Sequence, residues 1–163
     1  MTLQKAETNL ANPELKKEDA LELVGSLNVL LSDYSVVYQK LRNFHWNVVG
    51  GDFYDVHEKL EEEYLAAAEL IDEIAERIRV MGYKPISTMK GFLEKANISE
   101  TDDDHTADQM IQAVIKDYKA LILSMKTVVK HALAINDYGT DHMVREMIIR
   151  TEKKIWMFQS FVK

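Results

Sequence analysis

Apolar residues recur at intervals of three and four along most of the chain, which is the period of an α-helix that buries one face. Four such stripes can be followed. They run from Val24 to His45, from Val56 to Ile78, from Met110 to Ile135 and from Val144 to Val162. The pattern therefore predicts an all-α protein with four long helices.

The breaks between the stripes predict how these helices are connected. The first break, at 47–51, contains two glycines, and Asp52 after it is a candidate N-cap. The last break, at 136–140, is equally short, so each pair of flanking helices should be antiparallel. The second helix should stop at Gly82.

The segment between the second and third long helices, 83–105, is too long for a tight turn. We expect it to cross the bundle and to carry a short helix near 87–94. A four-helix bundle with one long crossover in the middle is the ferritin-like arrangement. The 163 residues suffice for a single such domain, with 1–17 as a flexible N-terminal segment.

The amino-acid composition limits the metal ligands and the partners that this chain can have. The absence of cysteine excludes disulfides, thiolate metal sites and iron–sulfur clusters, so that nitrogen and oxygen remain as metal ligands. The net charge of −7 favours cations over nucleic acid as partners. The first twenty residues show neither a secretory nor a transit pattern, and no stretch is apolar enough to span a membrane, so a cytoplasmic location is expected.

The second helix carries a second stripe, made of potential metal ligands. His57 and Glu61 are spaced i,i+4, and so are Asp72 and Glu76. At about 100° per residue the four side chains share an arc of roughly 100°, centred roughly 140° from the apolar stripe. These side chains therefore face away from the chain's own core.

The two pairs are too far apart to share one metal within a chain. Eleven residues separate Glu61 from Asp72, which is about 16 Å at about 1.5 Å per residue. A two-fold axis across the middle of this helix would bring the acidic pair of one chain beside the histidine pair of another. Leu65 and Ala68 lie at that midpoint, on the same stripe. The spacing predicts a metal site between two subunits.

His45 at the end of the first helix can fold back across the glycine loop and supply a second imidazole. Two histidines and three carboxylates suit iron with open positions better than a closed zinc site. No Glu-x-x-His motif of the ordinary ferritin site occurs, and the sequence from His57 to Glu61 lacks the last histidine of the zinc-protease motif.

The same residues resemble the Dps family of ferritin-like proteins, the DNA-binding proteins from starved cells. The resemblance covers most of the chain. It rests on the segments Asn43–Asn47, His57–Glu58, Asp72–Arg79 and Ile155–Phe158. In that family, two histidines and an acidic residue of one subunit bind iron together with an Asp and a Glu of its two-fold mate.

Carried over by position, the resemblance implies that His45, His57, Glu61, Asp72 and Glu76 form a ferroxidase centre. Glu61 stands where the family usually has aspartate. Because glutamate is one methylene longer, Glu61 is the one residue of the five whose iron binding is expected to differ from the family's. Trp46 resembles the family's tryptophan beside the centre.

The resemblance also implies an activity and an assembly. It implies a hollow shell of twelve subunits that oxidises Fe(II), preferably with hydrogen peroxide, and stores a ferric mineral, protecting the cell against oxidative stress. Family members that bind DNA mostly use a basic tail. Here Lys5, Lys16 and Lys17 are offset by Glu7, Glu14 and Glu18, so weak or no DNA binding is expected. A DNA-protection protein with secondary iron chemistry and a zinc-stabilised assembly remain the alternatives.

Other residues have simpler interpretations. Asp137 and Asp141, in and after the last turn, are candidates for an iron uptake pore, although turn and cap chemistry explains them equally well. The run from Asp102 to His105 is expected to be a solvated loop that caps the third long helix. Trp156 is expected to pack inside. Five further acids are expected to form a solvated face: Glu58, Glu62, Glu63, Glu69 and Glu73.

Overall fold

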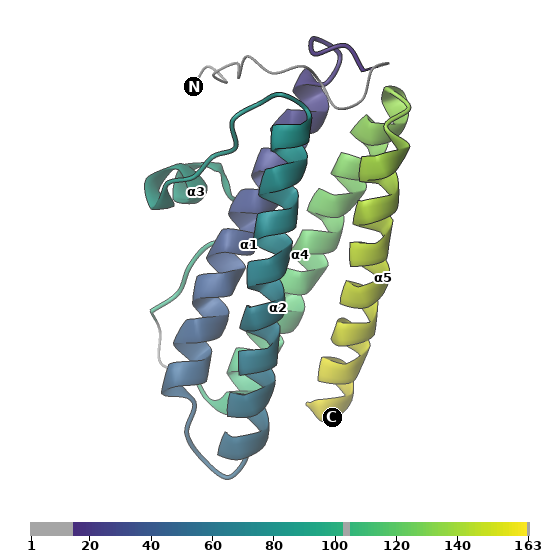
Figure 1. Cartoon of the computed structure of the whole chain (residues 1–163). Coiled ribbons are helices and arrows are strands. Elements are labelled where there is room, and N and C mark those ends of the chain that lie inside the picture. Colours follow the sequence, from purple (N-terminus) through teal and green to yellow (C-terminus); the bar gives the residue numbers. More distant parts are fainter. Residues whose placement is uncertain (1–14, 103–104, 163) are drawn as a thin grey trace.

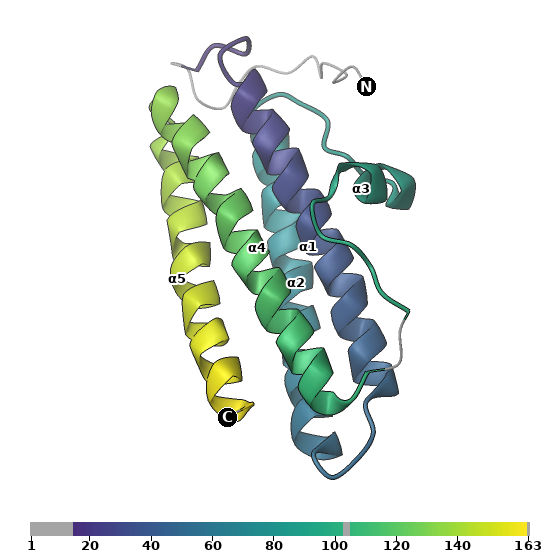
Figure 2. The ribbon, with the colours of Figure 1, turned by 180° about the vertical axis from the view of Figure 1, so that it is seen from behind.

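The computed structural model describes residues 15–102 and 105–162, and all of its regular secondary structure there is helical. Figures 1 and 2 show four long helices side by side, with a short fifth helix outside the bundle. The helices are α1 (Leu21–Asn47), α2 (Phe53–Val80), α3 (Met89–Lys95), α4 (Ala107–Ala134) and α5 (Tyr138–Phe161). The predicted all-α bundle is confirmed.

The topology is two antiparallel hairpins joined by one crossover. Figure 1 places the α1–α2 loop at one end of the bundle and the α4–α5 turn at the other. The chain between α2 and α4 returns along the outside of α1, where α3 lies. The predicted connections and the predicted short helix are therefore confirmed.

Local sequence explains where α2 and α4 end. Gly82 and Asn136 both have a positive φ, 72° and 56°, in the left-handed region that glycine and asparagine adopt most readily. After Gly82, the amide of Tyr83 donates to the carbonyl of Ile78. After Asn136, the amide of Asp137 donates to the carbonyl of Ala132. These bonds satisfy carbonyls that the helix ends would otherwise leave unpaired.

Two expectations about how helices begin need correction. Asp52 is at the N-cap position of α2, but its side chain makes no capping bond there. The cap of α4 is Thr106, whose hydroxyl accepts from the amide of Gln109 while the Gln109 side chain accepts in return. Of the acidic run expected to cap α4, Asp103 and Asp104 lie outside the described residues.

Part of the expected N-terminal tail is packed. Leu15 is buried, and the Tyr83 hydroxyl donates to the carbonyl of Lys17. Residues 15–17 therefore belong to the body of the domain, whereas 1–14, with Lys5, Glu7 and Glu14, lie outside the described residues.

Two buried polar side chains of α1, Asn28 and Asp33, hold the crossover in place, and Asn28 accepts from the amide of Ile86. Asp33, fully buried, accepts from the amides of Asn97 and Ile98 and from the hydroxyl of Ser124. One face of α1 thereby fixes both the end of the crossover and the neighbouring α4. These bonds also satisfy a carboxylate that would be costly to bury alone.

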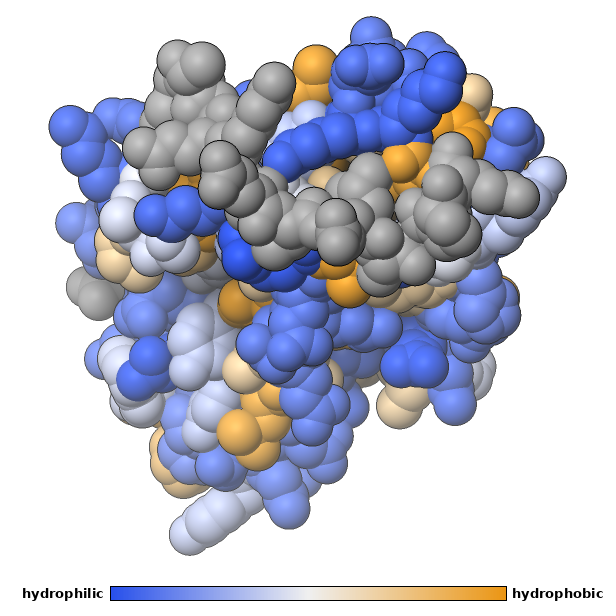
Figure 3. Space-filling model, turned by 45° about the horizontal axis from the view of Figure 1, so that its top comes forward, coloured by the Kyte–Doolittle hydropathy of each residue, from blue (hydrophilic) through white to orange (hydrophobic). Residues whose placement is uncertain are grey.

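The surface drawn in Figure 3 is mostly hydrophilic, with apolar residues in small separate spots, in keeping with the high content of charged residues. Among the residues described, none of the helices combines the length and the apolar character that a bilayer crossing requires.

Candidate metal centre

The α1–α2 loop brings His45 and His57 together. His45 lies in the last turn of α1, and His57 lies in the second turn of α2. Between them, Val48 is buried and extended, and Gly50 has a φ of 113°, which an L-residue rarely adopts. The turn that the two glycines permit therefore places the two imidazoles side by side.

The two histidines hold each other in a reciprocal pair. Their rings are nearly parallel, with centroids 3.8 Å apart and planes at 21°. Nδ1 of His45 lies 2.8 Å from the backbone carbonyl of His57, and Nδ1 of His57 lies 2.9 Å from that of His45. A carbonyl only accepts, so each Nδ1 carries the proton and donates it. Each Nε2 then has a lone pair available for a metal ion.

Aromatic side chains fix this pair on both sides. Phe53 stacks on His57 with centroids 4.8 Å apart, and the ring of Tyr64 meets His45 edge-on at 5.3 Å. His45 is only 7% exposed, and His57 is half-buried. The imidazoles are thus held in one orientation before any metal arrives.

Glu61 lies one turn beyond His57 and is exposed. Its carboxylate oxygen Oε1 accepts a hydrogen bond of 3.1 Å from the hydroxyl of Tyr64. Glu61 does not form a metal-binding group of three with His45 and His57 among the described residues, so their predicted grouping stays a prediction.

The acidic pair lies well away from the histidines. Asp72 and Glu76 are both exposed on the later part of α2, and neither forms an ion pair or hydrogen bond within the described parts of the chain. Leu65, between the two groups, is 55% exposed although it is apolar. The exposure of these positions confirms that the stripe faces away from the chain's own core.

No three His, Asp or Glu side chains come together as a metal-binding group within 15–102 and 105–162. The described chain therefore carries two separate groups of candidate ligands on one exposed stripe. The predicted completion of both groups by a second, antiparallel copy of α2 stays a prediction.

Trp46 follows His45 and is 57% exposed. The guanidinium of Arg42 lies over its ring, 4.6 Å from the centroid, as a cation–π contact. Trp156, which we expected to pack inside, is instead 64% exposed. Its position lies off the apolar stripe that buries Thr151, Ile155 and Phe158.

The two candidate uptake residues differ in their surroundings. Asp137 is 2% exposed, caps α5 by accepting from the amide of Thr140, and lies 2.6 Å from the guanidinium of Arg77. Burial raises the pKa of Asp137, but the hydrogen bonds from Thr140 and Arg77 outweigh it and lower the pKa overall. Asp141 is less buried and pairs with Arg145 at 2.6 Å. This geometry favours the cap interpretation for Asp137.

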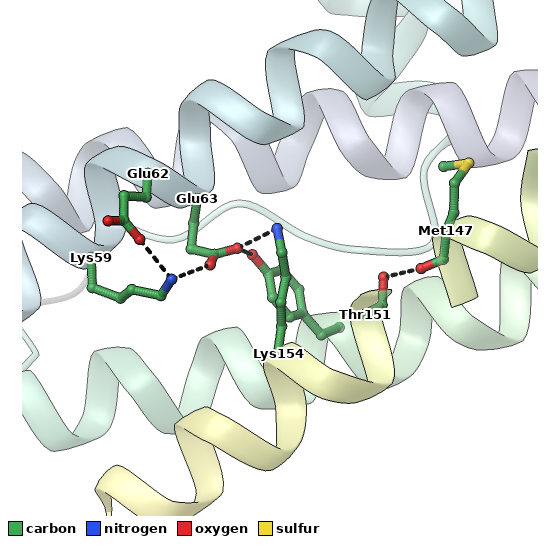
Figure 4. Close-up of polar contacts among 7 residues, drawn as sticks. Lys59, Glu62, Glu63, Met147, Thr151 and Lys154 are labelled. Carbon is green, nitrogen blue, oxygen red and sulfur yellow. Dashed lines mark hydrogen bonds and ion pairs between the residues drawn. The ribbon is translucent and has the colours of Figure 1, made fainter. Parts of the chain in front are cut away.

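One acid of the expected solvated face is buried. Glu63 is 2% exposed, whereas Glu58, Glu62, Glu69 and Glu73 are exposed as predicted. Figure 4 shows the Glu63 carboxylate of α2 pointing toward Lys154 of α5 and toward Lys59. The ammonium groups are 2.7 Å and 3.1 Å away, and the hydroxyl of Tyr118 donates at 2.6 Å.

This cluster borders a cavity of about 180 Å³ that is lined by residues of α1, α2, α4 and α5. Burial raises the pKa of Glu63, but the Lys154 ammonium, together with the Tyr118 and Lys59 hydrogen bonds, outweighs it and lowers the pKa. Two ammonium groups thus supply the positive charge around the one carboxylate here. The cluster is a charge pair across the bundle, and its ligand set does not match the Glu and Glu-x-x-His set of a bundle-core iron site.

Comparison with known proteins agrees with this architecture. The family description "Ferritin-like domain" matches residues 24–163. "DNA protection during starvation protein 2" of Bacillus anthracis is 39% identical over 86% of this chain and 97% of its own length. The chain belongs to the Dps family of ferritin-like proteins.

Solved Dps structures share the fold along nearly the whole chain. The Vibrio cholerae Dps crystal structure, described as a member of a broad superfamily of ferritin-like diiron-carboxylate proteins, superposes with a TM-score of 0.91 at 31% identity. The match covers 98% of this chain and 99% of the Vibrio cholerae chain. A Listeria innocua Dps soaked with zinc matches at a TM-score of 0.83 and 30% identity, over 86% and 95% of the two chains. The expected ferritin-like fold is confirmed.

Proposed function

We propose that this Dps-family protein is a ferroxidase and iron-storage protein whose oxidation sites form between two subunits. The observation that carries the proposal is the reciprocal pair of His45 and His57, which leaves both Nε2 atoms free for a metal ion. The exposed pair of Asp72 and Glu76 on the same stripe supports it, because it would supply hard oxygen ligands from a second copy.

Each proposed ligand has a distinct role. His45 and His57 bind Fe(II) through nitrogen, and Glu61 adds a carboxylate from the same chain. Asp72 and Glu76 of a second copy balance the positive charge of the iron and favour Fe(III) as it forms, since hard anionic oxygen ligands stabilise the higher charge. Open positions on the iron would admit the oxidant.

Hydrogen peroxide is the preferred oxidant in this proposal. One peroxide molecule takes up two protons and accepts one electron from each of two Fe(II) ions. The products are two Fe(III) ions and two water molecules. Because both electrons are transferred together, no hydroxyl radical is released. Fe(III) then hydrolyses and is stored as a mineral inside a hollow shell, for which we propose twelve subunits, in the cytoplasm.

The name of a relative raises the question of whether this chain also protects DNA. The Bacillus anthracis relative is called a DNA protection during starvation protein. Direct binding of DNA by this chain is opposed by its net charge of −7. We therefore propose that protection comes through iron and peroxide consumption, and that a gel shift at low salt will give no stable complex.

The test is an iron oxidation assay on apoprotein of verified assembly size. Fe(II) is added without oxygen, and hydrogen peroxide or air is then supplied in parallel while ferric absorbance, peroxide loss and retained iron are followed. We expect fast oxidation with peroxide and iron retained in the assembly. His57→Ala with Asp72→Ala should abolish the fast phase while the assembly remains intact.

The matched control is Glu58→Ala with Glu73→Ala, which changes two exposed positions outside the proposed centre. This control should oxidise iron at the wild-type rate. Oxidation of wild type no faster than in buffer would contradict the proposal. Zinc found in the purified protein at the same positions would favour the alternative of a metal that only stabilises assembly.

A further inference from the structure

Tyr64 contacts two of the proposed iron ligands at once. Its ring meets His45 edge-on, with centroids 5.3 Å apart and planes at 75°. Its hydroxyl donates to Oε1 of Glu61 at 3.1 Å. The ring also packs edge-on against Tyr38, with centroids 6.1 Å apart. Among the described residues, no other side chain forms a hydrogen bond or ring contact with both His45 and Glu61.

We propose that Tyr64 is a positioning residue of the metal centre, which holds the Glu61 carboxylate in the orientation that binds Fe(II). This inference rests on the proposed function, because it assigns a task within the same centre. The ring contact with His45 alone would be explained by packing. The hydroxyl bond to Glu61 is the feature that packing does not require.

Glu61 needs such a bond because it is exposed and flexible. An exposed glutamate has three side-chain torsions, and fixing them to bind a metal costs conformational entropy. A hydrogen bond to one carboxylate oxygen limits those torsions before the metal binds and leaves Oε2 free to coordinate. The entropy lost on binding is then smaller, and affinity is higher.

Tyr64 is suited to this task because its ring packs edge-on against two residues of α1, His45 and Tyr38. Its hydroxyl therefore has a nearly fixed position relative to the histidine pair. A tyrosine hydroxyl carries its proton at neutral pH and can donate it to a carboxylate. The rigid histidine pair thus determines where the flexible carboxylate lies.

The experiment is a double-mutant cycle with Tyr64→Phe and Glu61→Ala in the full-length assembled protein. Phenylalanine keeps both ring contacts and removes only the hydroxyl. The readouts are anaerobic Fe(II) binding by calorimetry, KM and kcat for Fe(II) with peroxide, and the melting temperature. Tyr38→Phe is the control, because Tyr38 touches Tyr64 through its ring and its hydroxyl forms no hydrogen bond with a carboxylate of the described residues.

We expect Tyr64→Phe to weaken Fe(II) binding roughly three- to ten-fold, which is the typical effect of one hydrogen bond. KM should rise by a similar factor with kcat little changed, and Tyr38→Phe should bind as wild type. In the Glu61→Ala background, Tyr64→Phe should have no further effect, because Tyr64 acts through Glu61.

Two results would overturn the inference while leaving the proposed function standing. Wild type and Tyr64→Phe could bind Fe(II) equally well, or Tyr64→Phe could weaken binding by the same factor with and without Glu61. The second result would mean that Tyr64 acts on His45 or on packing. A wild-type protein that binds no Fe(II) would instead overturn the proposed function, and with it this inference.

Discussion

The ammonium of Lys154 on α5 lies 2.7 Å from the carboxylate of Glu63 on α2, in the interior of the bundle. The pair joins the first hairpin to the second beside a cavity of about 180 Å³. Because the carboxylate is almost wholly buried, its partners determine whether it can remain charged there.

Removing the ammonium is therefore expected to destabilise the fold. Lys154→Met should lower the free energy of unfolding by about 3 kcal/mol, because a buried carboxylate loses its closest positive charge. Glu63→Gln combined with Lys154→Met should recover much of this loss. The measurement is urea unfolding at one fixed protein concentration, since assembly contributes to stability.

The exposed pair of Lys90 and Glu94 provides the control. Lys90→Met should cost less than about 1 kcal/mol, because exposed ion pairs contribute little. Equal losses for Lys154→Met and Lys90→Met would show that the buried pair has no special role in stability.

The lowered pKa of Glu63 predicts a pH dependence. Folding favours the ionised carboxylate, so its contribution is present above the ordinary glutamate pKa of about 4.3 and is lost as pH falls through the lowered value in the fold. The stability difference between wild type and Glu63→Gln should therefore shrink as the pH is lowered from 7 into this acidic range. A difference that stays constant across it would contradict the assignment.

Asp137 and Asp141 should respond differently to removal of their charge. Asp137→Asn weakens the buried contact with Arg77 and should destabilise by about 2 kcal/mol. Asp141→Asn affects a more exposed pair and should cost less than about 1 kcal/mol. We predict that any role in iron uptake belongs to Asp141. A slower uptake rate in Asp137→Asn that remains fully folded, with normal uptake in Asp141→Asn, would reverse that assignment.

Leu65 tests the two-fold contact. At the centre of the exposed stripe, Leu65→Glu would place two like charges near each other across the axis and should shift the assembly to smaller species by size-exclusion chromatography. Leu65→Met keeps the apolar contact and should assemble as wild type. An unchanged assembly in Leu65→Glu would mean that this stripe is not the interface.

The sequence predicted the helices well because the signals are local and strong. The apolar stripes, Gly82 and the short loops located the ends of the long helices. The cap of α4 was missed although Thr106 and Gln109 form a recognisable pair at the spacing of a capping box. The adjacent aspartates are also residues that favour the N-cap position, so the sequence offers competing caps.

Buried charge was harder to predict. Glu63 lies three residues after Leu60 and four before Ala67, which is a core position, but it closes a run of three glutamates that resembles a solvated face. Lys154 lies at a comparable position between Thr151 and Phe158. Matching core positions on two helices could have suggested the pair, whereas its distance required the structure.

The candidate metal ligands could be named from residue types and spacings, and their assembly into one centre stays a prediction. The reciprocal bonds between His45 and His57 could not be predicted, because they depend on the exact path of the glycine loop. The contact of Tyr64 with Glu61 has an i,i+3 spacing that is common on helices and carries little signal by itself.

The central claim is that each centre combines the histidines of one chain with Asp72 and Glu76 of another, and subunit complementation tests it most directly. Chains with His57→Ala and chains with Asp72→Ala are assembled separately and together, and Fe(II) oxidation by peroxide is measured. Each variant alone should lack the fast phase. In a mixed dimer, one of the two centres receives its histidines and its acids from unmutated positions. Random mixing should therefore restore roughly one quarter of the wild-type fast phase. Mixed assemblies as inactive as either variant alone would contradict a centre shared between subunits.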